Sequence, residues 1–173
     1  METKNNVKKQ YGCLMALFDE DYGKHFVNFS KKTIPHSMIY NDPNDPDGYG
    51  YETSPHVTIK YGFTPDLDKI KLASALKGTK PFIVDLIAIN RFVNPQFEVI
   101  KFDAESPVLR ELRSRVDCYP NEDTHPEYHP HMTLAYVKPN SLPLFKKEKI
   151  LIRVPVTRLH YSGADGKNIF INL

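Results

Sequence analysis

The sequence predicts an α+β domain built around a mainly antiparallel sheet. Apolar runs of strand length and segments of helical periodicity follow one another as strand, helix, paired strands, helix, strand and hairpin. Clusters of Gly, Pro, Asn and Asp separate these segments, as they do at turns. A length of 173 residues suits one domain. We therefore expect a single domain over residues 11–173, preceded by a flexible basic arm at residues 1–10.

The first half of the chain predicts two strands and two helices. The apolar run at 11–18 is typical of a buried strand, and a short helix is expected within 19–33. Residues 41–55 are so rich in Pro, Gly, Asn and Asp that they predict a long loop; Pro stands where a calcium loop needs a ligand. A strand at 56–62 follows. The helix expected at 66–77 ends at Gly78 and has one apolar face, made of Leu67, Ile70, Leu72 and Leu76.

The second half predicts five more strands and a third helix. Strands are expected at 81–93 and 95–103, with Asn94 and Pro95 at the turn between them. The helix expected at 105–117 has an apolar face made of Val108, Leu109, Leu112 and Val116. After a polar loop at 119–130, the remaining strands are expected at 131–137, 150–161 and 168–173.

Composition excludes several classes of function. The chain has 23 basic and 21 acidic residues, whereas a protein that binds duplex DNA usually has a strong basic bias. Its longest apolar run, residues 13–18, is far shorter than the roughly 18 residues of a spanning helix, and the polar start resembles no signal peptide. Cys13 and Cys118 are isolated, so they predict neither a disulfide framework nor a zinc knuckle. We expect a cytoplasmic monomer that binds neither duplex DNA nor a membrane.

One heptapeptide occurs twice. Residues 55–61 are Pro-His-Val-Thr-Ile-Lys-Tyr, and residues 130–136 are Pro-His-Met-Thr-Leu-Ala-Tyr. Each copy follows a loop and begins a predicted strand, which indicates an internal duplication. A single His-x-Thr is a weak motif, but two copies with the same Pro before and Tyr after are far more specific.

Strand geometry predicts the face on which each side chain of the repeat lies. Residues two apart point to the same face, so His56 lies beside Thr58, and His131 beside Thr133. The other face is apolar and should belong to the core, which predicts packing roles for Tyr61 and Tyr136. This apolar face is made of Val57, Ile59 and Tyr61 in the first copy and of Met132, Leu134 and Tyr136 in the second.

Two His and two Thr on polar faces suit the cleavage of a phosphodiester. One imidazole can take the proton of the attacking hydroxyl while the other protonates the leaving oxygen. The Thr hydroxyls can donate to the non-bridging oxygens as charge develops there. The alternative is a zinc site in the second copy, but the first copy has no such neighbours, so we expect no metal and no cofactor. The zinc site would be built from His125, His129, His131, Glu122, Asp123 and Glu127.

Paired His-x-Thr-apolar motifs on strands, in a chain of this size, resemble the 2H phosphoesterase superfamily. The resemblance spans residues 11–173, although its specific part is the two motifs. It implies a bilobal fold: two mainly antiparallel sheets with pseudo-twofold symmetry around a central cleft, and helices on the outside. It also implies catalytic roles for the four motif residues His56, Thr58, His131 and Thr133.

The residues around the motifs, 50–62 and 129–138, are most similar to the phage anti-CBASS nucleases. That resemblance implies a metal-independent phosphodiesterase that cleaves the 3′–5′ bonds of cyclic di- and trinucleotide immune messengers, in the host cytoplasm if the protein is viral. The ribose 2′-hydroxyl would attack the adjacent phosphate. Two alternatives stay open: an enzyme that acts on RNA ends, such as a 2′,3′-cyclic phosphodiesterase or a 2′-5′ RNA ligase-like enzyme, and a non-catalytic nucleotide sponge.

Four further residues are candidates for substrate binding. Lys60 continues the face of His56 and could steady phosphate charge, or it could be a solvated lysine at the rim. Tyr11 could stack on a base, and Tyr49 and Tyr51 could close over a ligand, although all three could equally be ordinary aromatic residues. Glu52 could orient His56. Structural or solvated roles are expected for Arg153, Arg158 and His160.

Overall fold

The computed structural model describes residues 11–45, 48–122, 127–141 and 147–173. The predicted arm at residues 1–10 lies outside them. The helices are α1 (Glu20–Thr33), α2 (Lys69–Leu76) and α3 (Pro107–Val116), with a 3₁₀ turn at His36–Met38. The strands are β1 (Gly12–Phe18), β2 (His56–Phe63), β3 (Phe82–Val93), β4 (Glu98–Glu105), β5 (His131–Val137), β6 (Glu148–Ser162) and β7 (Asn168–Asn172). None of the helices in this part of the chain is long and apolar enough to cross a membrane.

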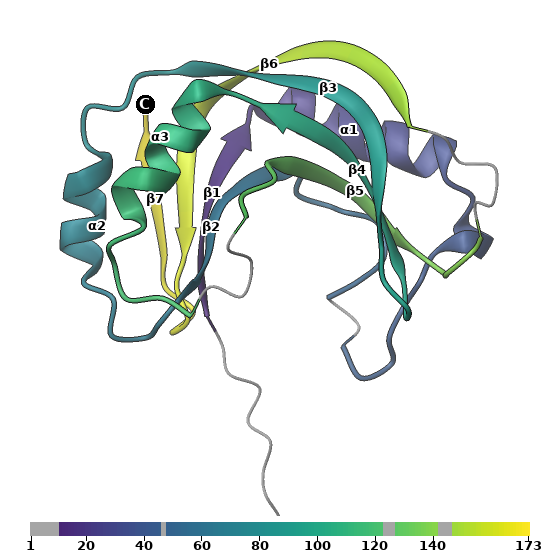
Figure 1. Ribbon diagram of the computed structural model, residues 1–173, viewed down its shortest axis with the longest axis horizontal. Helices are drawn as coiled ribbons and strands as arrows, with labels where there is room; N and C mark the ends of the chain where they lie inside the picture. The colour runs from purple at the N-terminus through teal and green to yellow at the C-terminus, as the bar shows by residue number, and fades with distance from the viewer. Residues whose placement is uncertain (1–10, 46–47, 123–126, 142–146) are drawn as a thin grey trace, which may run out of the picture.

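The strands form one antiparallel sheet in the order β1-β2-β5-β4-β3-β6-β7, and β6 also pairs with β1. The two sheets expected from the sequence are therefore two halves of a single sheet. The cause is β6, whose 15 residues pair with β3 in their first part and with β1 and β7 in their second. Figure 1 shows β3 and β6 arching from one half to the other. The α+β class and its antiparallel pairing are confirmed.

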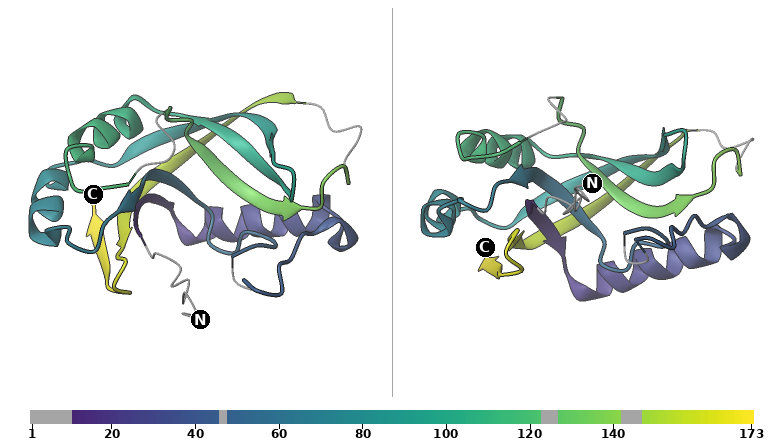
Figure 2. Two further views of the ribbon diagram at one scale, coloured as in Figure 1. Left: turned by 60° about the horizontal axis from the view of Figure 1, so that its bottom comes forward. Right: turned by 90° about the horizontal axis from the view of Figure 1, so that it is seen from below.

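The helices lie on the outside of the sheet. The helices α2 and α3 lie together at one end of the molecule, and α1 lies beside the other half (Figures 1 and 2). Phe26 of α1 packs on Phe102 of β4 with ring centroids 5.9 Å apart. Leu72 of α2 and Leu109 of α3 are fully buried in the same core. Each half of the sheet thus has one face covered by helix and one face left for the site.

Most predicted elements are confirmed, with boundaries that differ by a few residues. The helix expected from residue 66 begins at Lys69, because the Asp68 side chain accepts the Ile70 and Lys71 amides and caps the first turn. The strand expected from residue 95 begins at Glu98, since residues 94–97 form the turn. The 3₁₀ turn at His36–Met38 was not predicted.

Candidate active site

The two copies of the repeat lie on neighbouring strands of the sheet, β2 and β5. Val57 of β2 pairs with Met132 of β5, and the two strands are antiparallel. Continuing that register by one residue in each direction sets His56 opposite Thr133 and Thr58 opposite His131. A pseudo-twofold axis through the central pair therefore relates the motifs. The sequence predicted two polar pairs, and the structure brings them together on one face.

Both imidazoles are held by the same backbone contact. The Nδ1 atom of His56 lies 2.8 Å from the Ser54 carbonyl oxygen, and Nδ1 of His131 lies 2.8 Å from the His129 carbonyl oxygen. A carbonyl oxygen only accepts, so each Nδ1 carries a proton. Each Nε2 is then the nitrogen that can accept or donate a proton toward a ligand. The two rings are thus oriented identically with respect to their own strands.

Both motif strands contain a β-bulge at the residue after the Thr. The pairing of β2 with β1 skips Ile59, and the pairing of β5 with β4 skips Leu134. A bulge shifts the alternation of side chains by one position. The prediction that Tyr61 and Tyr136 belong to the core is therefore wrong. Tyr61 is 48% exposed and Tyr136 is half-buried, on the face that carries the His and Thr side chains.

The same shift moves Lys60 away from the face of His56. Lys60 is 1% exposed, on the side of β2 that packs against α3, and its ammonium group lies 2.5 Å from the Asp117 carboxylate. Its counterpart in the second copy is Ala135, which is fully buried. The prediction that Lys60 continues the face of His56 is wrong, because strict alternation ends at the bulge.

The neighbours of His131 are charged. Asp103 pairs with His131 across β4 and β5, and Lys101 pairs with Thr133. Lys101 is 3% exposed; it donates to Asp103, and its ammonium group lies 4.1 Å from the centroid of the Phe92 ring. The Phe92 ring meets the His131 ring edge-on at 4.9 Å.

This environment favours neutral His131. Burial lowers the pKa of His131 below its ordinary value, and the charges of Lys101 and His56 act in the same direction. The hydrogen bond to the His129 carbonyl and the charge of Asp103 oppose the shift without cancelling it. Burial opposes ionisation of Asp103, but hydrogen bonds from Lys101, Asn90 and Lys147 hold its pKa below the usual value. Sequence reasoning missed Lys101 and Asp103, although charges at alternate positions of an apolar strand were a usable signal.

The neighbours of His56 are apolar. In β1, Leu17 pairs with His56 and Met15 pairs with Thr58. One strand further, Arg158 pairs with Leu17, so its exposed side chain lies on the same face of the sheet. A cavity of about 720 Å³ lies at the end of β1, between α1 and residues 53–55; Arg158 and Ser54 are among the residues that line it, but none of the four motif residues is. The sequence predicted a structural or solvated role for Arg158. The structure leaves its side chain exposed and places it two strands from His56.

Aromatic side chains gather at both ends of this face. Tyr11 meets Tyr61 edge-on at 5.9 Å, and the Tyr11 hydroxyl donates to Glu122. At the other end Tyr49 meets Tyr136 edge-on at 5.3 Å. Tyr51 differs, because its hydroxyl donates to the Ile34 carbonyl at 2.6 Å and its ring stacks on His36. Of the three Tyr candidates, Tyr11 and Tyr49 pack on the Tyr side chains of the motifs. Tyr51 pairs with Ala135 of the second copy through its backbone, but its side chain packs against the segment after α1.

The remaining candidates from the sequence are Glu52, His160, Arg153 and the alternative zinc site. The Glu52 carboxylate accepts the Ser54 amide, so it shapes the loop whose carbonyl holds His56. His160 stacks on Phe170, and Arg153 donates to Asp85, in keeping with structural roles. Among the described residues, no group of three or more His, Cys, Asp or Glu could hold a metal ion. Two members of the alternative zinc site, Asp123 and His125, lie outside the described residues.

Comparison with known sequences identifies one family. Residues 41–168 match the family described as the 2′-5′ RNA ligase superfamily, and this span contains both motifs. A search of curated proteins found no match.

Solved structures share the fold at low sequence identity. E. coli LigT in complex with 3′-AMP has a TM-score of 0.60 and 15% identity over 96% of both chains. Thermus thermophilus TT0787 has a TM-score of 0.61 and 15% identity over 94% of both chains. Kluyveromyces marxianus Usb1 has a TM-score of 0.58 and 13% identity over 95% of this chain and 99% of its own.

Proposed function

The chain belongs to the 2′-5′ RNA ligase superfamily of 2H phosphoesterases and is a phosphodiesterase of that type; from this premise we propose that it cleaves the 3′–5′ bonds of cyclic di- and trinucleotides without a metal ion. One observation carries the proposal. The two imidazoles of neighbouring antiparallel strands have their Nδ1 atoms bound to backbone carbonyls, so both Nε2 atoms are available to one substrate phosphate.

The reaction is an internal transesterification. The ribose 2′-oxygen attacks the adjacent phosphorus, and its proton passes to Nε2 of His131. The bond between phosphorus and the 5′-oxygen breaks, and Nε2 of His56 gives its proton to that oxygen. The product is a linear nucleotide that ends in a 2′,3′-cyclic phosphate. No water is consumed, and one proton is taken up while another is released.

The assignment of base and acid follows from the neighbours of each His. A general base must be neutral at the start of the reaction, and burial together with Lys101 favours neutral His131. His56 then serves as the acid. Thr58 and Thr133 donate to the non-bridging oxygens, where negative charge grows in the transition state. Each Thr lies opposite the His of the other copy across β2 and β5, which suits a single phosphate among the four side chains.

A small cyclic substrate suits the charge and the aromatic residues of the cleft. A net charge of +2 is low for a protein that must hold a long polyanion. The pairs Tyr11–Tyr61 and Tyr49–Tyr136 lie at the two ends of the motif face, where bases on either side of the scissile phosphate could stack. The similarity of residues 50–62 and 129–138 to anti-CBASS nucleases supports the same substrate class.

A second candidate is an enzyme of RNA ends. The matched family is described by its 2′-5′ RNA ligases, and a similar structure of E. coli LigT contains 3′-AMP. The same two imidazoles would open a 2′,3′-cyclic phosphate or act on a 2′–5′ linkage. A third candidate is a non-catalytic protein that sequesters the nucleotide. The presence of both His and both Thr disfavours it, because binding alone needs no acid–base pair.

The test is to incubate the purified protein with 3′,3′-cyclic GMP-AMP in EDTA and to identify the products by mass spectrometry. We expect a linear dinucleotide with a 2′,3′-cyclic phosphate, formed at least about 10²-fold more slowly by His56→Ala or His131→Ala. A parallel reaction contains an RNA oligonucleotide that ends in a 2′,3′-cyclic phosphate. If the protein opened the cyclic phosphate of that RNA and left cyclic GMP-AMP intact, the second candidate would be favoured. Tight binding of cyclic GMP-AMP without turnover would favour the sponge. Loss of activity in EDTA would contradict the metal-free mechanism.

A further inference from the structure

The face that carries the motif side chains extends beyond the catalytic strands, over β1 to β6 and β7 (Figure 1). Met15 of β1 pairs with Thr58 on one side and with His160 of β6 on the other. His160 in turn pairs with Phe170 of β7. Residues that pair across antiparallel strands point to the same face, so His160 and Phe170 lie on the face of Thr58.

His160 and Phe170 form an exposed aromatic stack. Their ring centroids lie 4.4 Å apart, and the angle between the ring planes is 12°. Nε2 of His160 donates to Oδ1 of Asn168 at 2.9 Å, which holds the imidazole in place. His160 covers one face of the Phe170 ring, yet Phe170 stays 56% exposed. An ordered flat surface of this kind suits the stacking of a nucleobase.

Arg158 lies in the next row of the same face. It pairs with Leu17, which pairs with His56, so two strand spacings, about 10 Å, separate the backbones at Arg158 and His56. Its guanidinium lies 5.4 Å from the centroid of the Phe170 ring. Arg158 also lines the cavity at the end of β1, and it has no ion pair or side-chain hydrogen bond with any residue that the structure describes.

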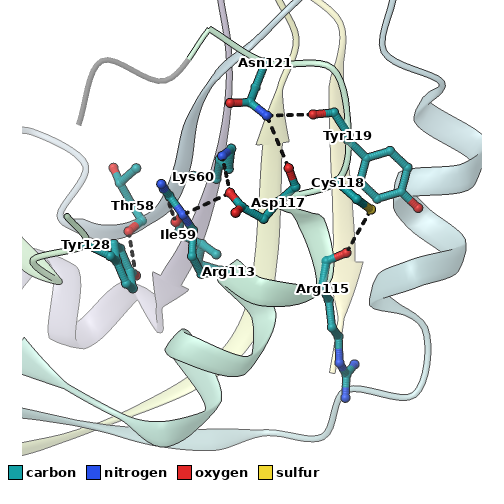
Figure 3. A network of polar contacts seen from close by, with 10 residues as sticks. All are labelled: Thr58, Ile59, Lys60, Arg113, Arg115, Asp117, Cys118, Tyr119, Asn121 and Tyr128. Atoms are coloured by element: carbon teal, nitrogen blue, oxygen red, sulfur yellow. Dashed lines mark hydrogen bonds and ion pairs between the residues drawn. The ribbon is translucent and has the colours of Figure 1, made fainter. Parts of the chain in front are cut away.

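Two cations beside the opposite face of β2 are engaged within the protein (Figure 3). The Lys60 ammonium group lies 2.5 Å from the Asp117 carboxylate, and Arg113 donates to the Ile59 carbonyl at 3.2 Å. Arg158 differs from both, because its exposed guanidinium is available to an anion on the motif face.

We propose that Arg158, His160 and Phe170 bind the nucleotide that carries the leaving 5′-oxygen, with its base on the aromatic stack and its own 3′-phosphate at Arg158. This rests on the proposed function, in which His56 is the acid and therefore faces that oxygen. A guanidinium matches two oxygens of a phosphate, and every base has a π-face that can stack on an aromatic ring. In a cyclic dinucleotide this 3′-phosphate is the one that is not cleaved, so these residues hold the substrate at a second point.

The test is a titration of the native chain with 3′-AMP and with adenosine, followed by NMR. 3′-AMP resembles the leaving nucleotide, because it has a free 5′-hydroxyl and a 3′-phosphate. We expect saturable shifts of the Arg158, His160 and Phe170 signals with both compounds. Arg158→Gln should weaken the binding of 3′-AMP about fivefold and leave that of adenosine unchanged. Phe170→Leu should weaken both about tenfold, and Phe170→Tyr, which keeps the ring, should restore them.

Arg153→Gln and Tyr22→Leu are the matched controls. Arg153 is exposed on the same strand as Arg158, but it pairs with Asp85 in the part of β6 that lies against β3. Tyr22 is an exposed aromatic residue of α1, outside the strands of the motif face. Neither variant should change the affinity for 3′-AMP or for adenosine.

Two results would overturn the proposal: shifts confined to His56 and His131, or equal affinities in the native chain, Arg158→Gln and Phe170→Leu. Neither result depends on cleavage. A failure to cleave cyclic GMP-AMP therefore contradicts the proposed function and leaves the binding of 3′-AMP at Arg158 and Phe170 to be judged separately. Where cleavage occurs, Arg158→Gln and Phe170→Leu should both raise the KM for cyclic GMP-AMP, and an unchanged KM would contradict a role in substrate binding.

Discussion

The two halves of the active site share their imidazoles and hydroxyls but differ in what lies beside them. The positions next to His56 and Thr58 on β1 are occupied by Leu17 and Met15. The corresponding positions on β4, next to His131 and Thr133, are occupied by Asp103 and Lys101. In the proposed mechanism the reacting groups are repeated, whereas burial, together with the Lys101 charge on β4, lowers the pKa of His131.

The bulges of the two strands give a second comparison. The Leu134 carbonyl accepts from the Ser30 hydroxyl of α1 and from the Glu52 amide, both at 2.9 Å. The Ile59 carbonyl accepts from the Arg113 side chain of α3. The same backbone irregularity is therefore stabilised by a small buried hydroxyl in one half and by a long cation in the other. The arrangement at Ile59 leaves a polar cavity beside the strand.

The largest effects should come from the residues that the halves share. His56→Ala and His131→Ala should each reduce the rate of cleavage about 10²- to 10⁴-fold, because each removes one proton transfer. Single-turnover measurements at saturating enzyme compare the two variants directly. A variant that retained the native rate would show that its imidazole takes no part in the reaction.

The hydroxyls should matter less than the imidazoles. Thr58→Val and Thr133→Val should each reduce kcat about 10²-fold, since each removes one donor to the developing charge on phosphate. The matched controls are Thr58→Ser and Thr133→Ser, which keep the hydroxyl and should recover most of the rate. If the Val and Ser variants were equally slow, packing of the methyl group would be the cause.

The pH dependence should distinguish the halves. The rate should follow a bell-shaped profile whose acidic limb reports protonation of His131, the base. Lys101→Met removes a cation beside His131 and leaves Asp103 in place, so the pKa of His131 should rise and the acidic limb should move to higher pH. The imidazole titration of His131, followed by NMR, measures the same shift without relying on activity.

Lys147→Met is the control for this experiment. Lys147 also pairs with Asp103, at 3.1 Å, but its side chain is more than half exposed. Solvent screens such a charge, so the acidic limb should move little. Equal shifts in the two variants would mean that the Asp103 network as a whole, and not the buried Lys101 charge, sets the pKa of His131.

The smallest effect should come from the bulge contact of Ser30. Ser30→Ala removes one of the two donors to the buried Leu134 carbonyl and should lower the free energy of unfolding by about 1 kcal/mol, because the Glu52 amide remains. Ser74→Ala, at an exposed position of α2, controls for the change in helix propensity. Urea denaturation of both variants measures the difference, and equal stabilities would assign Ser30 no role at the bulge.

The local pattern of the sequence was sufficient to predict the helices and strands and to single out the motif residues. The period of two along a strand sets His56 beside Thr58 whatever surrounds them, and the repeated heptapeptide singled out both His-x-Thr motifs. Asn94 and Pro95 correctly marked a turn, since such residues adopt turn geometry without tertiary contacts. The sequence by itself therefore determined the α+β class, most element boundaries and the four residues of the motifs.

Tertiary structure decided which way the residues after each Thr point and what surrounds each His. A bulge depends on hydrogen bonds to a partner strand far along the chain, so the alternation of residues 56–61 predicted the wrong faces for Lys60 and Tyr61. The neighbours of His131 come from β4, about 30 residues earlier in the chain, and only strand pairing brings Lys101 and Asp103 to it. Periodicity along one segment carries no information about its partner, which is why the two similar motifs become chemically different only in the folded sheet.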